Sequence, residues 1–370
     1  MAMILGIEST CDETAAAVVA DGVDVRSSVI ATQFELHEIY RGVVPEIASR
    51  AHIENIVPVI HQALDEAHCR LADIGAIAVA QRPGLIGSLL IGVTAAKTLA
   101  WSLEKPLLGV DHVQAHLYSV VLRGKGEGAA RVEGEGVRRK VESSLTPYAC
   151  PLTPHLPAIG LVCSGGHTAL YLIKSWSDVT LIGATIDDAI GEAYDKVAGI
   201  LGLGYPGGPA IDQLAPSGNP KAIAFPRSRL DRDSLDFSFS GLKTSVLYHV
   251  RGHKGRERDP GSVSQAELHD ICASFQQACI DILLIKLGRA VERFGARSVI
   301  VGGGVSANRG LRAALTDWQR PAYFPRMEYC TDNAAMIAGF GHILLDQGIT
   351  GDLSMDAVTS SRIRRIDAVD

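Results

Sequence analysis

The stretch that decides the fold is residues 4–20, which reads ILGIESTCDETAAAVVA. Its apolar parts, residues 4–8 and 15–20, are expected to be buried strands, because short apolar runs bounded by turn residues are typical of such strands. The polar residues 10–13 form the turn between them. The second half of the chain repeats this pattern, with strands expected at residues 159–163 and 168–173 around the turn Ser164-Gly165-Gly166-His167. Such a repeat predicts two similar α/β lobes with a cleft between them.

Further apolar runs extend both halves. We expect strands at residues 74–80, 107–110 and 298–301, and helices at residues 88–102, from about 308, and at 334–345. This order divides the chain into a first lobe over residues 1–122, an insertion or linker over 123–156, a second lobe over 157–345 and a tail over 346–370. In such an arrangement, opposing turns hold phosphates and the cleft floor holds a nucleoside.

The composition is that of an ordinary globular protein. Of the 370 residues, 47% are hydrophobic and 21% are charged, which excludes disorder, collagen and coiled coil. The net charge of −6 by itself disfavours a nucleic-acid binder, since such proteins more often carry a basic excess. Aromatic residues make up only 5%, so base-stacking platforms are not expected to dominate.

Cysteine spacing and hydropathy bear on the compartment. The seven cysteines form no C-x-x-C pair, which favours reduced thiols over a disulfide framework. Residues 1–8 contain no basic segment and reach an acid at Glu8, so no signal peptide is expected. The longest uncharged apolar stretch, residues 83–96, is too short to span a bilayer. We therefore expect a soluble, cytoplasmic protein that engages no membrane.

His112 and His116 are the candidate metal ligands. In a helix, their i, i+4 spacing places both imidazoles on one face, one turn apart, as a metal requires. No glutamate follows His112, so this is not the H-E-x-x-H motif of a zinc protease, which needs that glutamate as its general base. Asp332 is the candidate third ligand. Its alternative role is the N-cap of the helix at 334–345, and one acid can do both.

Two glycine-rich turns are candidate phosphate or nucleotide sites. The backbone N–H groups of Gly165 and Gly166 can approach an anion because no Cβ intervenes, although a plain hairpin turn is the alternative. Residues 302–308, GGGVSAN, join an expected strand to a helix, and Asn308 can hydrogen-bond a base or ribose. This segment lacks the spacing of a dinucleotide fingerprint or a Walker A loop, so the alternative is that its glycines serve close packing rather than nucleotide binding.

Acidic residues gather in two places. Asp12 and Glu13 lie in the first turn, where adjacent carboxylates either position a hydroxyl, a metal-bound water or a ribose, or simply cap the turn. A second group recurs at helical spacing, as is typical of a solvated acidic face, and comprises Asp187, Asp188, Glu192 and Asp195. The loop at residues 205–209, YPGGP, follows this group and fixes a backbone that a ligand can approach closely; Asp212 lies just beyond it.

Together these motifs closely resemble the TsaD family of tRNA threonylcarbamoyladenosine synthase subunits, formerly called the O-sialoglycoprotein endopeptidase family. The matching stretches occur in family order and are residues 6–14 (GIESTCDET), 42–52 (GVVPEIASRAH), 111–116 (DHVQAH), 164–168 (SGGHT), 187–196 (DDAIGEAYDK), 205–209 (YPGGP), 237–244 (FSFSGLKT), 303–308 (GGVSAN) and 330–333 (CTDN). The resemblance implies the actin-like, sugar-kinase-like two-lobed α/β fold with duplicated subdomains and a central nucleotide cleft, in agreement with the repeat.

The same resemblance implies an activity and a site. The activity is transfer of threonylcarbamoyl from threonylcarbamoyl-AMP to N6 of adenosine 37 in tRNAs reading codons that begin with A, with release of AMP. One Fe²⁺ or Zn²⁺ would be held by His112, His116 and Asp332. The adenylate site would comprise Val162, Cys163, Ser164, Gly165, Gly166, Asp195, Gly208, Asp212 and Asn308. The implied partners are tRNA and the TsaB and TsaE subunits, with the adenylate supplied by TsaC. Asp12 and Glu13 are candidates for orienting the incoming amine or taking its proton.

The sequence departs from the family pattern in three places. Arg82 stands where glycine is usual, Gln114 where glutamate is common, and the charged insertion at 123–144 has no counterpart in the short bacterial form. Three alternatives compete with the transferase: an ATPase or sugar kinase of the same fold, a metallopeptidase, and a nucleotide-bound scaffold whose partner performs the catalysis. The missing glutamate after His112 already weakens the peptidase.

A tRNA substrate and a net charge of −6 are compatible if the attraction to phosphate is local. The candidate basic patches are Arg138-Arg139-Lys140, residues 251–258 with Arg251, Lys254, Arg256 and Arg258, and Arg362 with Arg364 and Arg365. We expect partner subunits to supply further contacts.

Overall fold

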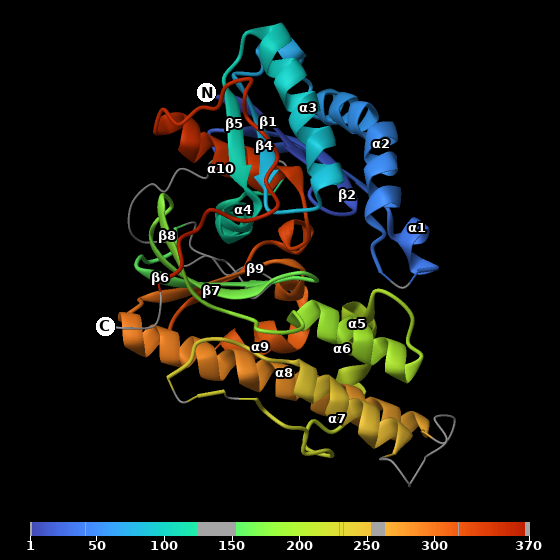
Figure 1. The fold of residues 1–370 in the computed structure, drawn as a ribbon. Helices are drawn as coiled ribbons and strands as arrows, with labels where there is room; N and C mark the ends of the chain where they lie inside the picture. The colour runs from blue at the N-terminus through green and yellow to red at the C-terminus, as the bar shows by residue number, and fades with distance from the viewer. Residues whose placement is uncertain are drawn as a thin grey trace, which may run out of the picture.

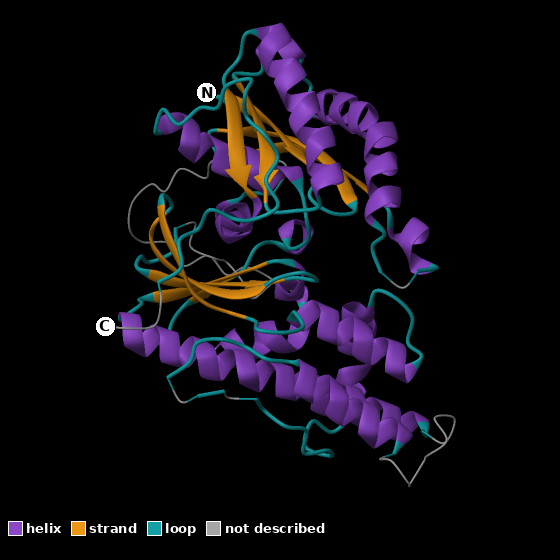
Figure 2. Cartoon of the chain, viewed as in Figure 1, coloured by secondary structure: helices purple, strands orange, loops and turns teal. Residues whose placement is uncertain are grey.

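Two five-stranded mixed sheets, each flanked by helices, form the framework of the molecule (Figure 1; Figure 2). The structure is a computed structural model that describes residues 2–40, 42–124, 153–228, 230–231, 233–252, 263–316 and 318–366. The patch Arg138-Arg139-Lys140, residues 253–258 of the second basic patch and most of the expected insertion lie outside the described residues.

The first sheet has the strand order β3-β2-β1-β4-β5. β1 (Met3–Glu8) pairs antiparallel with β2 (Glu13–Ala20), which pairs antiparallel with β3 (Asp24–Thr32). On its other side, β1 pairs in parallel with β4 (Ala76–Arg82), and β4 does so with β5 (Leu107–Asp111). The helices of this part are α1 (Phe34–Glu38), α2 (Pro45–Glu66) and α3 (Ile86–Leu103). α2 and α3 bury the outer face of the sheet through an apolar core.

The second sheet repeats this topology strand for strand, in the order β8-β7-β6-β9-β10. β6 (Ala158–Cys163) pairs antiparallel with β7 (Thr168–Ser175) and in parallel with β9 (Ser298–Gly302). β8 (Asp178–Ala184) and β10 (Ala322–Tyr323) complete the two edges. Its helices are α5 (Ile190–Leu201), α6 (Gly207–Leu214), α7 (Ser240–Arg251), α8 (Gln265–Phe294) and α9 (Arg309–Thr316). The prediction of two similar α/β lobes is confirmed.

Two helices lie between the sheets (Figure 1). α4 (His112–Tyr118) follows β5 but also contacts β6 and β9 of the second sheet. α10 (Ala334–Asp346) follows the second sheet in sequence but packs on β1, β2 and β4 of the first. One apolar core therefore joins the facing sides of the two sheets, from Ile4 in the first to Val162 in the second.

The C-terminal segment after α10 runs from one sheet edge to the other. Gly351 N donates to Leu107 O at 2.8 Å on β5, and the Gln81 side chain donates to Asp356 O at 2.7 Å. Further along, Leu181 N of β8 donates to Arg364 O at 2.9 Å. Residues 347–366 thus contact both lobes, although most of them are exposed.

The acidic residues at 187–195 do not form one helical face, which corrects the expectation from their spacing. α5 begins only at Ile190, so Asp187 and Asp188 precede it. The Asp187 carboxylate accepts from the Ser238 and Ser240 hydroxyls and from Phe239 N, at the start of α7. Asp188 pairs with Lys196 and Lys243 at 2.8 and 2.6 Å. These acids are therefore bound to neighbouring elements and order the loop before α7.

Two helices in the described part, α3 and α8, are long and apolar enough to cross a membrane by length and composition. α8 is largely buried in the core of the second lobe, and α3 packs on α2 and β4. Core helices share this length and composition, so the two helices are weak indications of a membrane span.

Candidate active site

α4 carries both candidate metal histidines, and Asp111 determines where it begins. Asp111 ends β5, and its Oδ1 accepts from Val113 N at 3.1 Å and Gln114 N at 3.3 Å, an N-cap that satisfies two free N–H groups of the first turn. Its Oδ2 accepts from the Ser361 hydroxyl at 2.7 Å. His112 and His116 do lie on one helix, the condition under which their spacing places both imidazoles on one face, and the strand end and the C-terminal segment both hold that helix in place.

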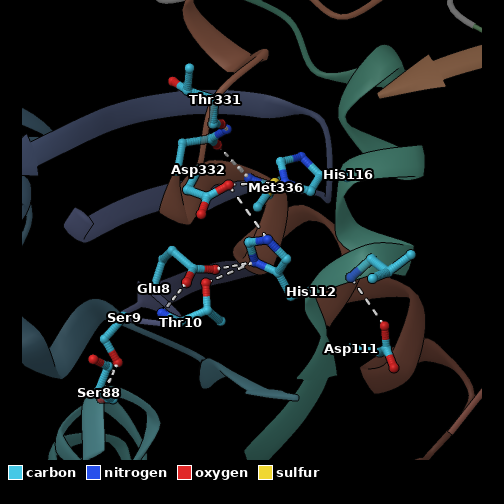
Figure 3. Close-up of polar contacts among 12 residues, drawn as sticks. Glu8, Ser9, Thr10, Ser88, Asp111, His112, His116, Thr331, Asp332 and Met336 are labelled. Atoms are coloured by element: carbon cyan, nitrogen blue, oxygen red, sulfur yellow. Dashed lines mark hydrogen bonds and ion pairs between the residues drawn. The ribbon is translucent and has the colours of Figure 1, made fainter. Parts of the chain in front are cut away.

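The structure brings His112, His116 and Asp332 together (Figure 3). His116 Nε2 lies 3.0 Å and His112 Nε2 lies 3.5 Å from Asp332 Oδ1, and the three ligand atoms fall within 4.8 Å of one another. The alternative reading of Asp332 as a helix N-cap is wrong. Asn333 caps α10 instead, its Oδ1 accepting from Met336 N at 3.0 Å, so the Asp332 carboxylate stays available to the histidines.

The donor set fits a metal ion. Two imidazole nitrogens and a carboxylate oxygen suit Fe²⁺ or Zn²⁺ and leave further positions open for a substrate or water. His112 Nδ1 lies 2.8 Å from Glu8 Oε2, which leaves Nε2 to face Asp332. His116 Nδ1 is buried and has no hydrogen-bond partner among the described residues. Both rings therefore offer Nε2 toward one point.

The triad is electrostatically coupled. Burial alone raises the pKa of Asp332, but the adjacent His112 and His116 outweigh burial and hold it well below its usual range. Burial lowers the pKa of His112, yet the carboxylates of Glu8 and Asp332 raise it well above its ordinary value. Burial and the neighbouring His112 lower the pKa of His116. Metal binding requires an ionised carboxylate and neutral imidazoles. The shifts favour these states at Asp332 and His116, whereas His112 would give up its Nε2 proton when an ion binds.

The first turn holds Asp12 and Glu13 close to this triad. The Cys11 carbonyl oxygen lies 3.0 Å from His52 Nε2 of α2 and accepts from the Ser88 hydroxyl of α3 at 3.3 Å. Both helices therefore hold the turn in place. Asp12 is 7% exposed. Burial, then the carboxylates of Asp332 and Asp12, raise the pKa of Glu13 well above its usual range. Glu13 is therefore close enough to the triad for the charge of Asp332 to act on its carboxyl group.

The opposing turn at residues 164–167 is closed by its own hydrogen bonds. Ser164 N donates to His167 O at 2.8 Å, and His167 N donates to Ser164 Oγ at 3.1 Å. Gly165 and Gly166 are exposed, and a Cβ on either would meet no heavy atom within 4 Å in the described part of the chain. Their backbone therefore borders open space. Gly191 of α5 lies against this turn, because a Cβ there would come within 2.6 Å of Ser164 O.

The other candidate adenylate residues contribute either their backbone atoms or a side chain that holds a neighbouring segment in place. Val162 and Cys163 are buried in β6, so only their backbone can face a ligand. Asp195 Oδ1 accepts from Gly207 N at 2.7 Å and so holds the start of α6, where a Cβ on Gly208 would meet no heavy atom within 4 Å in the described part of the chain. These residues build the wall of the site rather than its functional groups.

Asn308 and Asp212 both make hydrogen bonds at the start of α9. Asn308 donates to Gln276 Oε1 at 2.8 Å and accepts from Leu311 N at 2.8 Å, so its amide already caps α9. Asp212 Oδ2 accepts from Arg309 Nε at 2.8 Å. Asp212 Oδ1 is buried and lacks a hydrogen-bond partner among the described residues. That free acceptor suits a ligand hydroxyl.

Two residues of the site escaped the sequence reasoning. The sequence predicts Glu8 only as the end of a buried strand and predicts no partner for His52, yet Glu8 contacts His112 and His52 holds the first turn. His52 Nδ1 also lies 2.7 Å from Thr14 Oγ1. The only signal for Glu8 was an acid at the end of an otherwise buried strand, which is costly unless it is paired.

The duplicated sheets, with the group His112, His116 and Asp332 beside the helices packed between them, define a protein of the actin-like two-lobed class. Among solved structures, HypF proteins share this fold: full-length HypF in the phosphate- and nucleotide-bound form has a TM-score of 0.55 at 13% identity, covering 95% of this chain and 47% of that one. HypF from T. kodakarensis also gives 0.55, at 14% identity and covering 94% and 48% of the two chains. At these identities the likeness concerns the fold alone.

Comparison of sequences identifies the family. The profile of the TsaD family, tRNA N6-adenosine threonylcarbamoyltransferase, matches residues 24–131 and 145–339. The tRNA N6-adenosine threonylcarbamoyltransferase of Trichlorobacter lovleyi is 46% identical over 97% of this chain and 96% of its own. That of Moorella thermoacetica is 48% identical over 90% and 89% of the two chains. The chain belongs to the TsaD family and is an enzyme, a transferase that acts in threonylcarbamoyl modification of tRNA.

Proposed function

We propose that this enzyme transfers threonylcarbamoyl from threonylcarbamoyl-AMP to N6 of adenosine 37 in tRNAs that read codons beginning with A. In this reaction a bond forms between N6 and the carbamoyl carbon. The bond from that carbon to the phosphate oxygen breaks, AMP leaves with the electron pair, and N6 loses a proton. The observation that carries the proposal is the meeting of the triad His112, His116 and Asp332 with the first turn and, through Gly302, with the second sheet.

The adenylate is proposed to lie against the second lobe. The exposed backbone of Gly165 and Gly166 faces its phosphate or carbamate, since N–H groups without a neighbouring Cβ can approach an anion closely. The free Oδ1 of Asp212 accepts a ribose hydroxyl, and Gly208 leaves room beside it. Asn308 acts mainly by capping α9 and keeping its N-terminus toward the ligand.

Glu13 is the proposed acceptor of the N6 proton, with Asp12 beside it orienting the amine. A carboxyl group whose pKa is raised is a better base when it is ionised than an ordinary one. Glu13 has that property, with burial as its main cause. Glu13 begins β2, directly after the first turn, and the charge of Asp332 acts on it, so it lies near the candidate metal ligands.

One Fe²⁺ or Zn²⁺ is the proposed cofactor, held by His112, His116 and Asp332. When bound, such an ion supplies a Lewis acid that stabilises charge developing on an oxygen of the adenylate. The chain's own contribution is to keep the three ligand atoms within 4.8 Å of one another and largely shielded from solvent.

tRNA is the proposed macromolecular substrate, bound by local basic groups. Arg362 and Arg364 are exposed on the C-terminal segment, whereas Arg365 pairs with Asp236 at 2.8 Å and so has less charge to offer. Phosphate contacts of this kind make affinity fall steeply with salt. Charge reversal at Arg362 and Arg364 is expected to weaken tRNA binding several-fold; unchanged affinity would assign binding to other surfaces or to partners.

TsaB and TsaE are the proposed protein partners, with TsaC as the source of the adenylate, in the cytoplasm. The packed helices α2 and α3 expose large apolar side chains one turn apart, Ile53 with Val57 and Ile86 with Leu90. Neighbouring exposed apolar side chains on packed helices favour a protein partner. Pull-down of TsaB by the wild type, and its loss with Ile53→Glu and Val57→Glu, tests this surface.

A single assay tests the transferase. The purified chain, its partners, threonine, bicarbonate, ATP and the adenylate-forming enzyme are incubated with tRNA, and the tRNA nucleosides are analysed by mass spectrometry. Threonylcarbamoyl adenosine that requires this chain is the expected result. Phosphate release from ATP to a simple acceptor, with no change in the tRNA, would instead support a kinase-like activity.

A further inference from the structure

Glu8 is a buried acid with two defined partners (Figure 3). It ends β1, is 0% exposed and lies opposite Ala15 of β2. Its Oε1 accepts from Thr10 N at 2.6 Å, and its Oε2 lies 2.8 Å from His112 Nδ1. An ionised carboxylate in such a place is costly unless both oxygens are hydrogen-bonded, and here each oxygen has one partner.

The first of these contacts constrains the second. A backbone N–H can only donate, so Oε1 is committed to Thr10. A carboxylate has no proton to give, so Oε2 must also accept, and the proton between it and His112 therefore belongs to Nδ1. With Nδ1 as the donor, the lone pair of a neutral His112 lies on Nε2, the atom 3.5 Å from Asp332 Oδ1.

We propose that Glu8 is a positioning residue that fixes the tautomer and the ring orientation of His112, so that Nε2 is the metal-binding atom. The inference rests on the metal site of the proposed function. Residues that hold the outer nitrogen of a ligating histidine generally affect metal affinity by 10–100-fold.

His116, the other histidine of the site, lacks an arrangement of this kind. His116 Nδ1 is buried but has no partner among the described residues, so nothing equivalent to Glu8 selects the tautomer of His116. Thr10 Oγ1 also approaches His112 Nδ1, but at 3.4 Å it is a weaker contact than the carboxylate. The orientation of His112 therefore depends mainly on Glu8.

Glu8→Gln is the sharpest variant, because it keeps the shape and removes one of the two acceptors. A glutamine that still accepts from Thr10 N turns its NH₂ toward His112, and this favours the proton on Nε2, the nitrogen needed for the metal. Competition with a chelator is expected to show Zn²⁺ affinity about 10–100-fold below wild type. Thr10→Val is the matched control, since it removes only the hydroxyl contact, and it should stay within about threefold. Circular dichroism and the unfolding temperature confirm that both variants fold.

Nitrogen NMR of the Zn²⁺-loaded wild type gives a second measurement that needs no variant. His112 should carry a slowly exchanging proton on Nδ1 and have Nε2 bound to zinc. Zinc on Nδ1, or Glu8→Gln with wild-type zinc affinity, would overturn the inference. His116→Ala separates this failure from that of the metal site: if that variant also binds zinc normally, the triad itself is not the site.

Discussion

The backbone carbonyl of His116 lies against Gly302, so closely that a Cβ at Gly302 would come within 2.6 Å of the carbonyl oxygen. His116 belongs to α4, which follows the first sheet, and Gly302 ends β9 of the second. The two lobes therefore meet through backbone atoms beside the group His112, His116 and Asp332. This contact ties the position of α4 to the turn that leads to Asn308.

Gly302→Ala is expected to disturb that contact. Because the new methyl group meets backbone, which cannot rotate away, we expect a loss of about 1–3 kcal/mol in the free energy of unfolding and weaker metal binding. Chemical denaturation and metal competition measure the two effects. Gly199→Ala is the control: it lies in α5, where a Cβ meets nothing within 4 Å in the described structure, and should be neutral or stabilising. Equal behaviour of the two variants would contradict this reading.

His116→Ala is expected to lose bound metal and transfer activity while the protein stays folded. Its Nε2 is one of three ligand atoms, and two remaining ligands hold an ion poorly. Elemental analysis after dialysis, the transfer assay and circular dichroism provide the readouts. His61→Ala, an exposed histidine of α2, should keep wild-type metal content. Full activity in a metal-free His116→Ala protein would remove the metal from the mechanism.

If Glu13 is the proton acceptor, as proposed, Glu13→Gln is expected to lower turnover about 10²–10⁴-fold without loss of metal, since Glu13 is not among the three candidate ligands. Burial raises the pKa of Glu13, and a base works only when it is ionised, so wild-type turnover should fall as the pH drops through that raised value. The variant should lose this acid limb. The pH profile of single-turnover rates tests both points, and a larger loss in Asp12→Asn than in Glu13→Gln would transfer the role to Asp12.

Lys286 gives the stability of the fold a distinctive dependence on pH. It is fully buried in α8, where Nζ donates to Ser234 O at 2.7 Å, and burial lowers its pKa from 10.5 to about 8. Between these values the unfolded chain binds more protons than the folded one, so the free energy of unfolding should rise with pH, by about 3 kcal/mol at most. Below pH 8 Lys286 is charged in the folded protein as well, and the free energy of unfolding is lowered by the full cost of burying that charge. Denaturation across pH should show this slope in wild type and in Lys174→Met, an exposed control, but not in Lys286→Met.

The local sequence pattern was enough to predict those parts of the site that lie within a single segment of the chain. The i, i+4 spacing of His112 and His116 placed both on α4, and apolar runs on either side of polar turns located β1, β2, β6 and β7. These features depend on neighbours a few residues apart, whose geometry the backbone period determines. Helical spacing failed for Asp187 and Asp188, because a hydrogen-bonded loop to α7 replaced the expected helical turn.

The sequence by itself determined the duplicated α/β pattern, the histidine pair and, through its motifs, the family. Only the tertiary structure decided that Asn333 rather than Asp332 caps α10, that Glu8 holds His112, and that α10 returns to the first sheet. Asp332 lies 216 residues from His116, and no local periodicity relates positions so far apart. Such pairs meet because two separately folded sheets bury their facing sides in one core, and the identities of the partners follow from that packing.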